Sequence, residues 1–184
     1  MESLIMGSQI IPTQTEVRLA YDELIISKTD LSGRITYANK VFMRISDFSE
    51  EDLLGQPHNI IRHPDMPRGV FWGLWNTLKQ GREFFGLVKN MTAHGDYYWV
   101  LANVRPDFLN GKSVGYFSVR RSPSRKLIEK IIPIYQQMLS MEHGRSGDSA
   151  QASWQWLEKT LASEDTNYER FILNLVESTK EIRA

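Results

Sequence analysis

The chain has 184 residues, enough for one hydrophobic core plus an appendage or for two small domains. Lys+Arg and Asp+Glu each number 22, so the formal net charge is zero and nothing global attracts nucleic acid or anionic lipid. There is no cysteine, which excludes disulfides, thiolate metal sites, catalytic thiols and a photochemical cysteine–flavin adduct.

Targeting signals are not evident in the sequence. Met1–Pro12 contains an acid and no basic residue, unlike a secretion signal. No stretch approaches the roughly 18 uninterrupted apolar residues of a membrane-spanning helix. We therefore expect a cytoplasmic protein without a direct membrane span.

The first half of the chain predicts a hairpin and two short helices after a weakly patterned arm at residues 1–19. Asp30–Gly33 has turn chemistry between two apolar runs, and Ser49–Asp52 is a capping-box pattern. The expected elements are strands at Glu23–Thr29 and Arg34–Ala38, a helix within Asn39–Phe48 and a short helix that Gly55 ends.

Gln56–Arg68 contains three prolines in thirteen residues, so a regular helix cannot run through it. Arg62, His63 and Asp65 lie between these prolines. A rigid backbone that carries convergent polar groups suits a ligand site, because little conformational entropy remains to be lost on binding. The alternative is a structural loop in which Arg62 and Asp65 pair with each other.

A helix and three antiparallel strands should follow. Gly69–Lys79 has one broad apolar face at helical spacing. The period then changes to two, and Asn110-Gly111 is a strong hairpin-turn signal. The expected strands are Phe84–Met91, Asp96–Phe108 and Ser113–Arg120.

The C-terminal third predicts three helices. Ser122-Pro123 suits a helix start, residues 142–149 read as a linker, and helices are expected near Ala150–Ala162 and Asn167–Arg183. Thr166-x-x-Glu169 predicts a capping box for the last one. The whole pattern indicates an α+β protein: a five-stranded antiparallel sheet with short helices on one face and a C-terminal helical extension.

This element order resembles that of PAS domains, and more specifically the sensory domain of Aer-type aerotaxis receptors. The resemblance covers roughly Gln14–Arg121, and its Arg62–Pro67 hexapeptide is unusually specific. It divides the chain into an arm (1–19), a PAS sensor domain (20–122), a connecting helix (123–141), a linker (142–149) and a helical extension (150–184). The motifs that carry it are Ser27-Lys-Thr-Asp30, Ile35-Thr-Tyr-Ala-Asn39, Gly55-Gln-Pro-His-Asn59, Arg62-His-Pro-Asp-Met-Pro67, Gly86-Leu-Val-Lys-Asn90, Gly95-Asp-Tyr-Tyr-Trp-Val100 and Gly115-Tyr116.

The resemblance implies a non-enzymatic redox or oxygen-linked sensor that binds FAD non-covalently and signals by conformational change. It also implies that Arg62, His63, Asp65 and Asn90 hold the flavin. The output would pass to a second copy of the chain or to a downstream signalling protein through the C-terminal helices. Many flavin-binding relatives carry tryptophan where this chain has Phe84.

Residue chemistry supports the same ligand independently. A flavin face needs apolar walls, its uracil-like edge needs amides, and its diphosphate needs cationic donors. Asp65 would orient Arg62 or His63, or bind the ribose. The candidates are Phe71, Trp75, Phe84 and Trp99 for the walls, Asn90, Asn103 and Asn39 for the edge, and Arg62 and His63 for the diphosphate.

The sequence also allows other roles for these residues and other functions for the protein. Asn39 and Asn103 could only satisfy backbone groups, and Trp99 could be plain core. The protein could be a cofactor-free PAS dimerisation module, or bind haem through His63. His63-x-Asp65 with His58 or His94 also matches a two-histidine, one-carboxylate metal site. No nucleophile elbow or Gly-rich phosphate loop is present.

Overall fold

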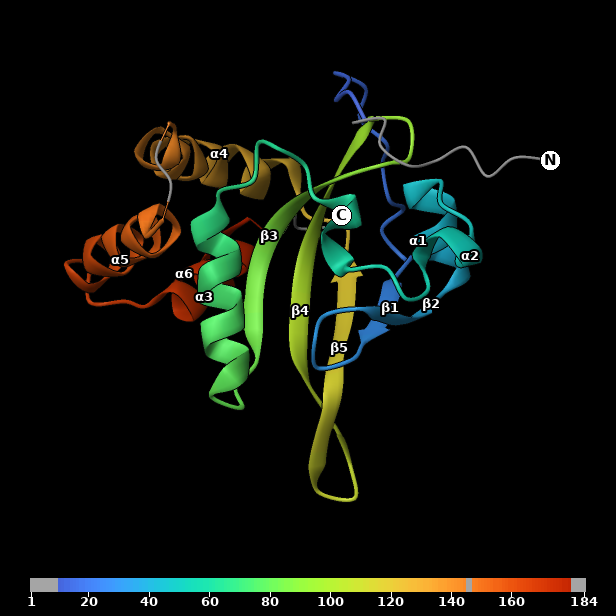
Figure 1. Ribbon diagram of the computed structural model, residues 1–184. Helices are drawn as coiled ribbons and strands as arrows, with labels where there is room; N and C mark the ends of the chain where they lie inside the picture. The colour runs from blue at the N-terminus through green and yellow to red at the C-terminus, as the bar shows by residue number, and fades with distance from the viewer. Residues whose placement is uncertain (1–9, 145–146, 180–184) are drawn as a thin grey trace.

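One five-stranded antiparallel sheet forms the centre of the protein, in the order β2-β1-β5-β4-β3 (Figure 1). The computed structural model describes residues 10–144 and 147–179. Together with the surrounding helices, the sheet confirms the predicted α+β class and the PAS fold. The strands are β1 (Ile25–Thr29), β2 (Ile35–Ala38), β3 (Phe84–Met91), β4 (Tyr97–Leu109) and β5 (Lys112–Arg121).

Local turn and capping chemistry acts as the sequence predicts. Asn110 and Gly111 both adopt positive φ, as a two-residue hairpin turn requires, and the long β4–β5 hairpin projects from one end of the sheet (Figure 1). Ser49 and Asp52 form the reciprocal capping box of α2. The helices are α1 (Lys40–Ser46), α2 (Glu50–Leu53), the 3-10 helix η1 (His58–Ile61), α3 (Arg68–Lys79), α4 (Arg125–Glu142), α5 (Ser149–Ala162) and α6 (Tyr168–Ser178).

Two predicted helix starts are wrong by one or two residues. α4 is capped by Ser124, whose hydroxyl accepts from the Leu127 amide, and not by Ser122. α6 is capped by the Asn167 side chain, which accepts from the Arg170 amide, and not by Thr166. In both places several residues can cap equally well, so the packing of the helix selects one of them.

The C-terminal helices pack on the protein's own sheet and on α3 (Figure 1). The apolar stripe of α4, which includes Leu127, Ile131, Tyr135 and Met138, is buried there. Tyr135 donates a hydrogen bond of 2.7 Å to the carbonyl of Leu87 in the edge strand β3. Within the described residues the extension therefore covers the edge that the sheet would otherwise expose.

The two ends of the chain carry predictions that the described residues do not reach. The first nine residues of the arm and the end of the last predicted helix, from residue 180 to Arg183, lie outside the described residues. The described arm makes an isolated bridge between Glu16 and Tyr97. The division of the chain into arm, sensor domain, connecting helix, linker and extension stays a prediction. No helix in the described ranges is long and apolar enough to cross a membrane.

Candidate functional site

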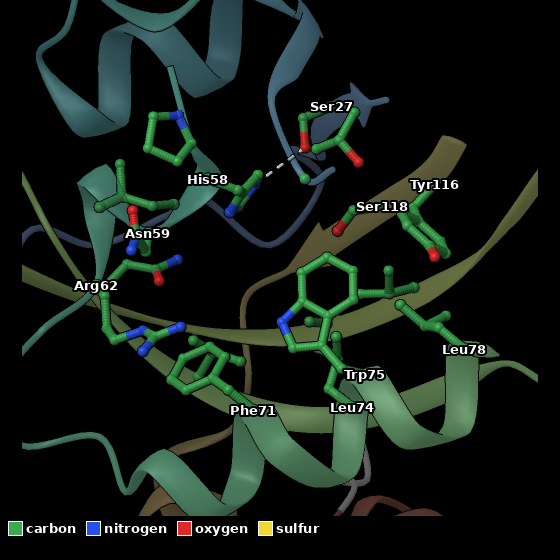
Figure 2. A pocket seen from close by; sticks show the side chains of 18 of the residues that line it. Ser27, His58, Asn59, Arg62, Phe71, Leu74, Trp75, Leu78, Tyr116 and Ser118 are labelled. Atoms are coloured by element: carbon green, nitrogen blue, oxygen red, sulfur yellow. Dashed lines mark hydrogen bonds between the residues drawn. The ribbon is translucent and has the colours of Figure 1, made fainter. Parts of the chain in front are cut away.

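A cavity of about 330 Å³ lies between α3, η1 and the inner face of the sheet (Figure 2). Its size falls within the range of about 300–1,000 Å³ that is typical of small-molecule sites. Most of its wall is apolar, and a few polar side chains point into it. This combination is typical of a pocket that encloses a largely planar or apolar ligand and fixes its orientation with a small number of polar contacts.

Helix α3 forms one wall of the cavity. Phe71, Leu74, Trp75 and Leu78 are spaced at i, i+3, i+4 and i+7, so they project from one face of the helix into the cavity (Figure 2). The Trp75 ring meets Tyr116 of β5 edge-on, with 5.3 Å between the ring centroids. The wall is thus built from aromatic and aliphatic surfaces held by helix geometry.

A buried cation lies on the opposite wall. The Arg120 side chain is only 2% exposed. Its Nε donates to Ser118 Oγ at 3.0 Å, and its Nη2 donates to Ser27 Oγ and to His58 Nε2, the latter at 2.8 Å. Its guanidinium carbon lies 4.8 Å from the centroid of the Phe42 ring. No carboxylate pairs with Arg120 in the part of the chain that the structure describes.

The local electrostatics follow from this arrangement. Burial lowers the pKa of Arg120 to about 10, which still leaves the guanidinium charged at neutral pH. Burial and the neighbouring Arg120 charge lower the pKa of His58 to about 3, so its imidazole is neutral. A neutral His58 Nε2 can accept the hydrogen bond from Arg120. The cavity wall therefore carries a fixed positive charge that no acidic group of the described chain neutralises.

Several polar atoms of the lining are buried without a hydrogen-bond partner within the described residues: Thr29 Oγ1, Arg62 Nε and Arg120 Nη1. An unsatisfied buried polar group costs about 1–3 kcal/mol, and more when it is charged. Two of these atoms belong to guanidinium groups. The donor set therefore fits a ligand that brings hydrogen-bond acceptors or negative charge.

Arg62 and Asn90 come together at the edge of the sheet. An isolated antiparallel bridge joins Arg62 to Asn90 of β3, and both residues line the cavity. The Arg62 guanidinium carbon lies 3.8 Å from the centroid of the Phe71 ring, a cation–π contact (Figure 2). Burial lowers the pKa of Arg62. Phe71 and Trp75 are the other two sequence-predicted site residues that line the cavity.

His63 and Asp65 lie outside the cavity lining. Consecutive residues of an extended segment point to opposite sides, so the bridge that turns Arg62 inward turns His63 away. His63 is buried against Tyr97, and its Nδ1 accepts from the Asp65 amide at 3.1 Å. Burial and the nearby Lys89 charge lower the pKa of His63. Asp65 pairs with Lys89 Nζ at 2.6 Å and makes no ion pair with Arg62.

Trp99 and Asn103 lie on the outer face of the sheet. Ala102 and Val104 line the cavity, so strand alternation places Trp99 and Asn103 on the other side of β4. The Asn103 amide donates to Glu83 at 3.0 Å. Asn90 and Asn103, both expected at the edge of the ligand, therefore lie on opposite faces of the sheet: Asn90 is opposite Tyr98 and Asn103 is opposite Phe85.

Phe84 also lies apart from the cavity lining. It packs against Trp154 of α5 and Tyr168 of α6, with ring centroids 6.4 Å and 5.5 Å away. It is four residues before Val88, which lines the cavity, and this corresponds to about 13 Å along a strand. Phe84 therefore belongs to an aromatic cluster between the sheet and the C-terminal helices.

Asn39 has a structural position. Its Oδ1 accepts from the amides of Ile26 and Phe42, at 3.1 and 3.0 Å, and its Nδ2 donates to the Leu24 carbonyl at 2.8 Å. The side chain thus caps α1 and ties it to β1, which was one of the two alternatives for this residue. Neither amide atom is left over for a ligand in the cavity.

Asn39→Ala should therefore lower stability rather than ligand binding. Loss of the cap and of the contact to β1 is expected to reduce the free energy of unfolding by about 2 kcal/mol. Denaturant unfolding measures this directly. Asn39→Asp keeps the acceptor oxygen and should recover part of the loss. An alanine variant of unchanged stability would contradict the capping role.

Sequence reasoning missed the polar cluster of Ser27, His58, Ser118 and Arg120. One signal was available: Tyr116, Ser118 and Arg120 alternate along the last strand, so they share a face. A basic residue on the face of a strand that points to the core is unusual and indicates either a buried partner or a ligand. Ser27 and His58 join the cluster through chain segments far apart in the sequence, which no local pattern shows.

The metal alternative finds no support within the described ranges. No three His, Cys, Asp or Glu side chains lie close enough to hold a metal ion. His58 faces the cavity, whereas His94 Nε2 lies 3.0 Å from Asp47. His63 and Asp65 thus have neither of these histidines beside them.

Comparison with known proteins identifies relatives of this chain. A family model described as the PAS fold matches residues 35–120. The chain is 42% identical over 133 residues to the aerotaxis receptor of Escherichia coli K12, which covers 72% of the chain and 26% of the receptor. It is 33% identical over 101 residues to the nitrogen fixation regulatory protein of Klebsiella pneumoniae, which covers 54% of the chain and 20% of that protein.

Among solved structures, the light state of the Aureochrome1 LOV photoreceptor domain matches with a TM-score of 0.54 and 21% identity. The match covers 64% of this chain and 93% of that domain. Identity at this level shows a shared fold only. The chain spans about a quarter of the aerotaxis receptor and about a fifth of the nitrogen fixation regulatory protein.

Proposed function

The chain belongs to the PAS family through its domain at residues 35–120, and on that basis we propose that it is a sensory protein that binds FAD non-covalently in the cavity beside α3. The observation that carries this proposal is a mostly apolar cavity whose wall holds two guanidinium groups without carboxylate partners among the described residues. An aromatic ligand with acceptor atoms and negative charge matches that wall. FAD has all three properties.

Different lining residues would contact different parts of the ligand. Phe71, Leu74 and Trp75 provide apolar surface for the ring system. The Asn90 amide can both donate and accept, which suits a uracil-like edge. Arg120 offers a buried cation to an electron-rich edge, and Arg62 offers a second cation for a phosphate group.

Sensing would use the reversible redox chemistry that a bound flavin supplies. The chain's own part is to hold a fixed charge at Arg120 and a rotatable amide at Asn90 beside the ligand. A change in ligand charge or protonation alters which orientation of the Asn90 amide is favoured. Asn90 lies on β3, so the change reaches the strand that the C-terminal helices cover. No step of this role requires turnover, and we propose that the protein is not an enzyme.

We also propose a signalling output and a cellular location for this domain. The relatives are by name a receptor and a regulatory protein, so we propose that this domain acts in taxis or a related signalling response in the cytoplasm. The signal would leave through the C-terminal helices to a second copy of the chain or to a downstream signalling protein.

The haem alternative is weaker because of the positions of His63, the expected haem ligand, and of His58, the histidine that lines the cavity. His63 does not line the cavity, and His58 Nε2 already accepts a hydrogen bond from Arg120. A cofactor-free PAS module remains the second candidate. It would have to tolerate the unpaired Arg120 charge inside an empty cavity, which carries a desolvation cost without a compensating contact.

The absorption spectrum of protein purified from cells tests the proposal. We expect the two-band visible spectrum of oxidised flavin, and denaturation should release FAD rather than FMN. A colourless protein that also fails to take up added FAD would contradict the proposal. A Soret band would indicate haem instead.

Arg62→Ala should lower FAD affinity about 10-fold, because one charge-assisted contact is lost. Arg105→Ala is the matched control: Arg105 also lies over a phenylalanine ring, Phe117 at 5.3 Å, but on the outer face of the sheet. We expect no change in affinity for it. The pair is read by fluorescence titration of the apoprotein with FAD, and equal affinities of the two variants would contradict the assignment of Arg62.

A further inference from the structure

Two faces of helix α3 contact different parts of the protein. One side lines the cavity with Phe71, Leu74 and Trp75. The other side carries Gly69 and Gly73, both buried against α5. A Cβ atom at Gly69 would overlap the Ser153 hydroxyl, and one at Gly73 would overlap the Trp154 indole. The backbone of α3 therefore packs directly on α5, with no α3 side chain between them at these two positions, so little slack is available to absorb a displacement of α3.

A buried carboxylate holds the same junction. Glu142, the last residue of α4, is 6% exposed. It accepts hydrogen bonds from the backbone amides of Arg68 and Gly69, at 2.7 and 2.8 Å, and from Ser153 Oγ at 2.5 Å. Pro67, at the N-cap of α3, provides no side-chain cap, so Glu142 takes over that role from another element.

This carboxylate makes partial separation of the helices unfavourable. If α3 moved away from α4 and α5, Glu142 would lose its donors while still largely buried, and the first amides of α3 would lose their acceptor. Buried polar networks are stable when complete and costly when incomplete. The junction of α3, α4 and α5 should therefore exist either fully docked or open.

A second connection runs through the edge strand. Tyr135 of α4 donates to the Leu87 carbonyl, and its hydroxyl lies 3.1 Å from that of Tyr168 in α6. Val88 and Asn90, one and three residues further along β3, line the cavity. The C-terminal helices thus contact both elements, α3 and β3, that enclose the cavity on this side (Figure 1).

We propose that α4–α6 dock on α3 as a unit. The equilibrium between the docked and the open state of these helices is thermodynamically coupled to occupation of the cavity. A ligand that fixes α3 against the sheet favours the docked state, and by linkage the docked state favours the ligand by the same factor. The proposal deepens the sensory role above by naming the junction through which the C-terminal helices would respond to the cavity, and it rests on that role only for the identity of the ligand. The expected coupling is about 10-fold in affinity.

Hydrogen exchange of the α5 amides tests the coupling without any ligand. Leu74→Ala removes cavity-facing bulk from α3 without touching α5, and Val104→Ala removes similar bulk from the sheet wall of the same cavity. We expect exchange in α5 to speed up about 10-fold in Leu74→Ala and to stay unchanged in Val104→Ala. Equal effects of the two variants on α5, or no effect of either, would overturn the proposal.

Ligand affinity tests the reverse direction. Gly73→Ala, which pushes on Trp154, should weaken FAD binding about 10-fold, whereas Asn76→Ala on the exposed side of α3 should not. Ser153→Ala removes one donor from Glu142 without adding bulk and repeats the test if Gly73→Ala folds poorly. Added FAD should also slow exchange in α5 of the unmutated chain.

The two proposals fail in different ways. If the unmutated chain binds FAD, but α5 exchange and the affinities of the junction variants stay unchanged, the coupling is overturned and the flavin proposal stands. If the chain binds no FAD, the flavin proposal fails, and the comparison of Leu74→Ala with Val104→Ala still decides the coupling.

Discussion

Arg120→Met is expected to lower FAD affinity about 100-fold while changing the free energy of unfolding of the ligand-free protein by no more than about 1 kcal/mol. Arg120 is buried without a carboxylate partner among the described residues, so the ligand-free protein bears the cost of desolvating its charge. Methionine is unbranched and uncharged, fills the space of the arginine stem and removes that cost, which offsets the lost hydrogen bonds to Ser27, Ser118 and His58. The ligand, by contrast, loses its buried cation.

This pair of measurements separates binding from structure. Titration with FAD gives the affinity, and denaturant unfolding of the apoprotein gives the stability. Arg121→Met, on the exposed neighbouring position of β5, is the matched control and should alter neither. A variant that binds FAD normally but loses about 3–5 kcal/mol of stability would show that Arg120 is a structural residue.

Stability should fall between pH 7 and pH 5 by about 2 kcal/mol because of His58 alone. Its pKa is about 3 in the folded protein against 6.5 for an unperturbed imidazole, since burial and the Arg120 charge, with a smaller contribution from Arg62, oppose protonation. Below pH 6.5 the unfolded chain binds a proton that the folded chain does not. The contribution is therefore complete above pH 6.5 and is lost as the pH falls towards 3.

His58→Gln should flatten this part of the profile, because the glutamine oxygen can still accept from Arg120 but does not titrate. His94→Gln is the control, since His94 is 75% exposed on the surface. His63, whose pKa burial also lowers, contributes in the same direction and accounts for any slope that remains. A His58→Gln profile as steep as that of the unmutated chain would contradict the assignment.

Local secondary structure could be predicted from the sequence alone. The bounds predicted for β3 match those observed, and the capping box at Ser49 and the turn at Asn110-Gly111 formed as expected. Each depends on side-chain periodicity or on the conformational preference of a few consecutive residues. The PAS fold followed from the order of such elements together with the motif resemblance.

The residues that line the cavity could be predicted only in part, for a geometric reason. Arg62, Phe71, Trp75 and Asn90 line the cavity, whereas Trp99 and Asn103 do not. Strand alternation with the register of β3 against β4 explains why Asn90 faces the cavity and the two β4 residues face away from it. His63 illustrates the same effect one residue from Arg62. A list of suitable residue types carries no information on which side of a strand each one faces until the register is known.

What the sequence determined by itself is therefore the set of elements, their order and the proline-containing segment that carries Arg62. Only the tertiary structure decided that Arg120 joins Ser27 and His58 in one buried cluster, and that Glu142 caps a helix 74 residues earlier in the chain. The reason is that helices, strands and turns arise from interactions between near neighbours. A binding site and its link to distant helices arise from residues whose proximity exists only after the chain has folded.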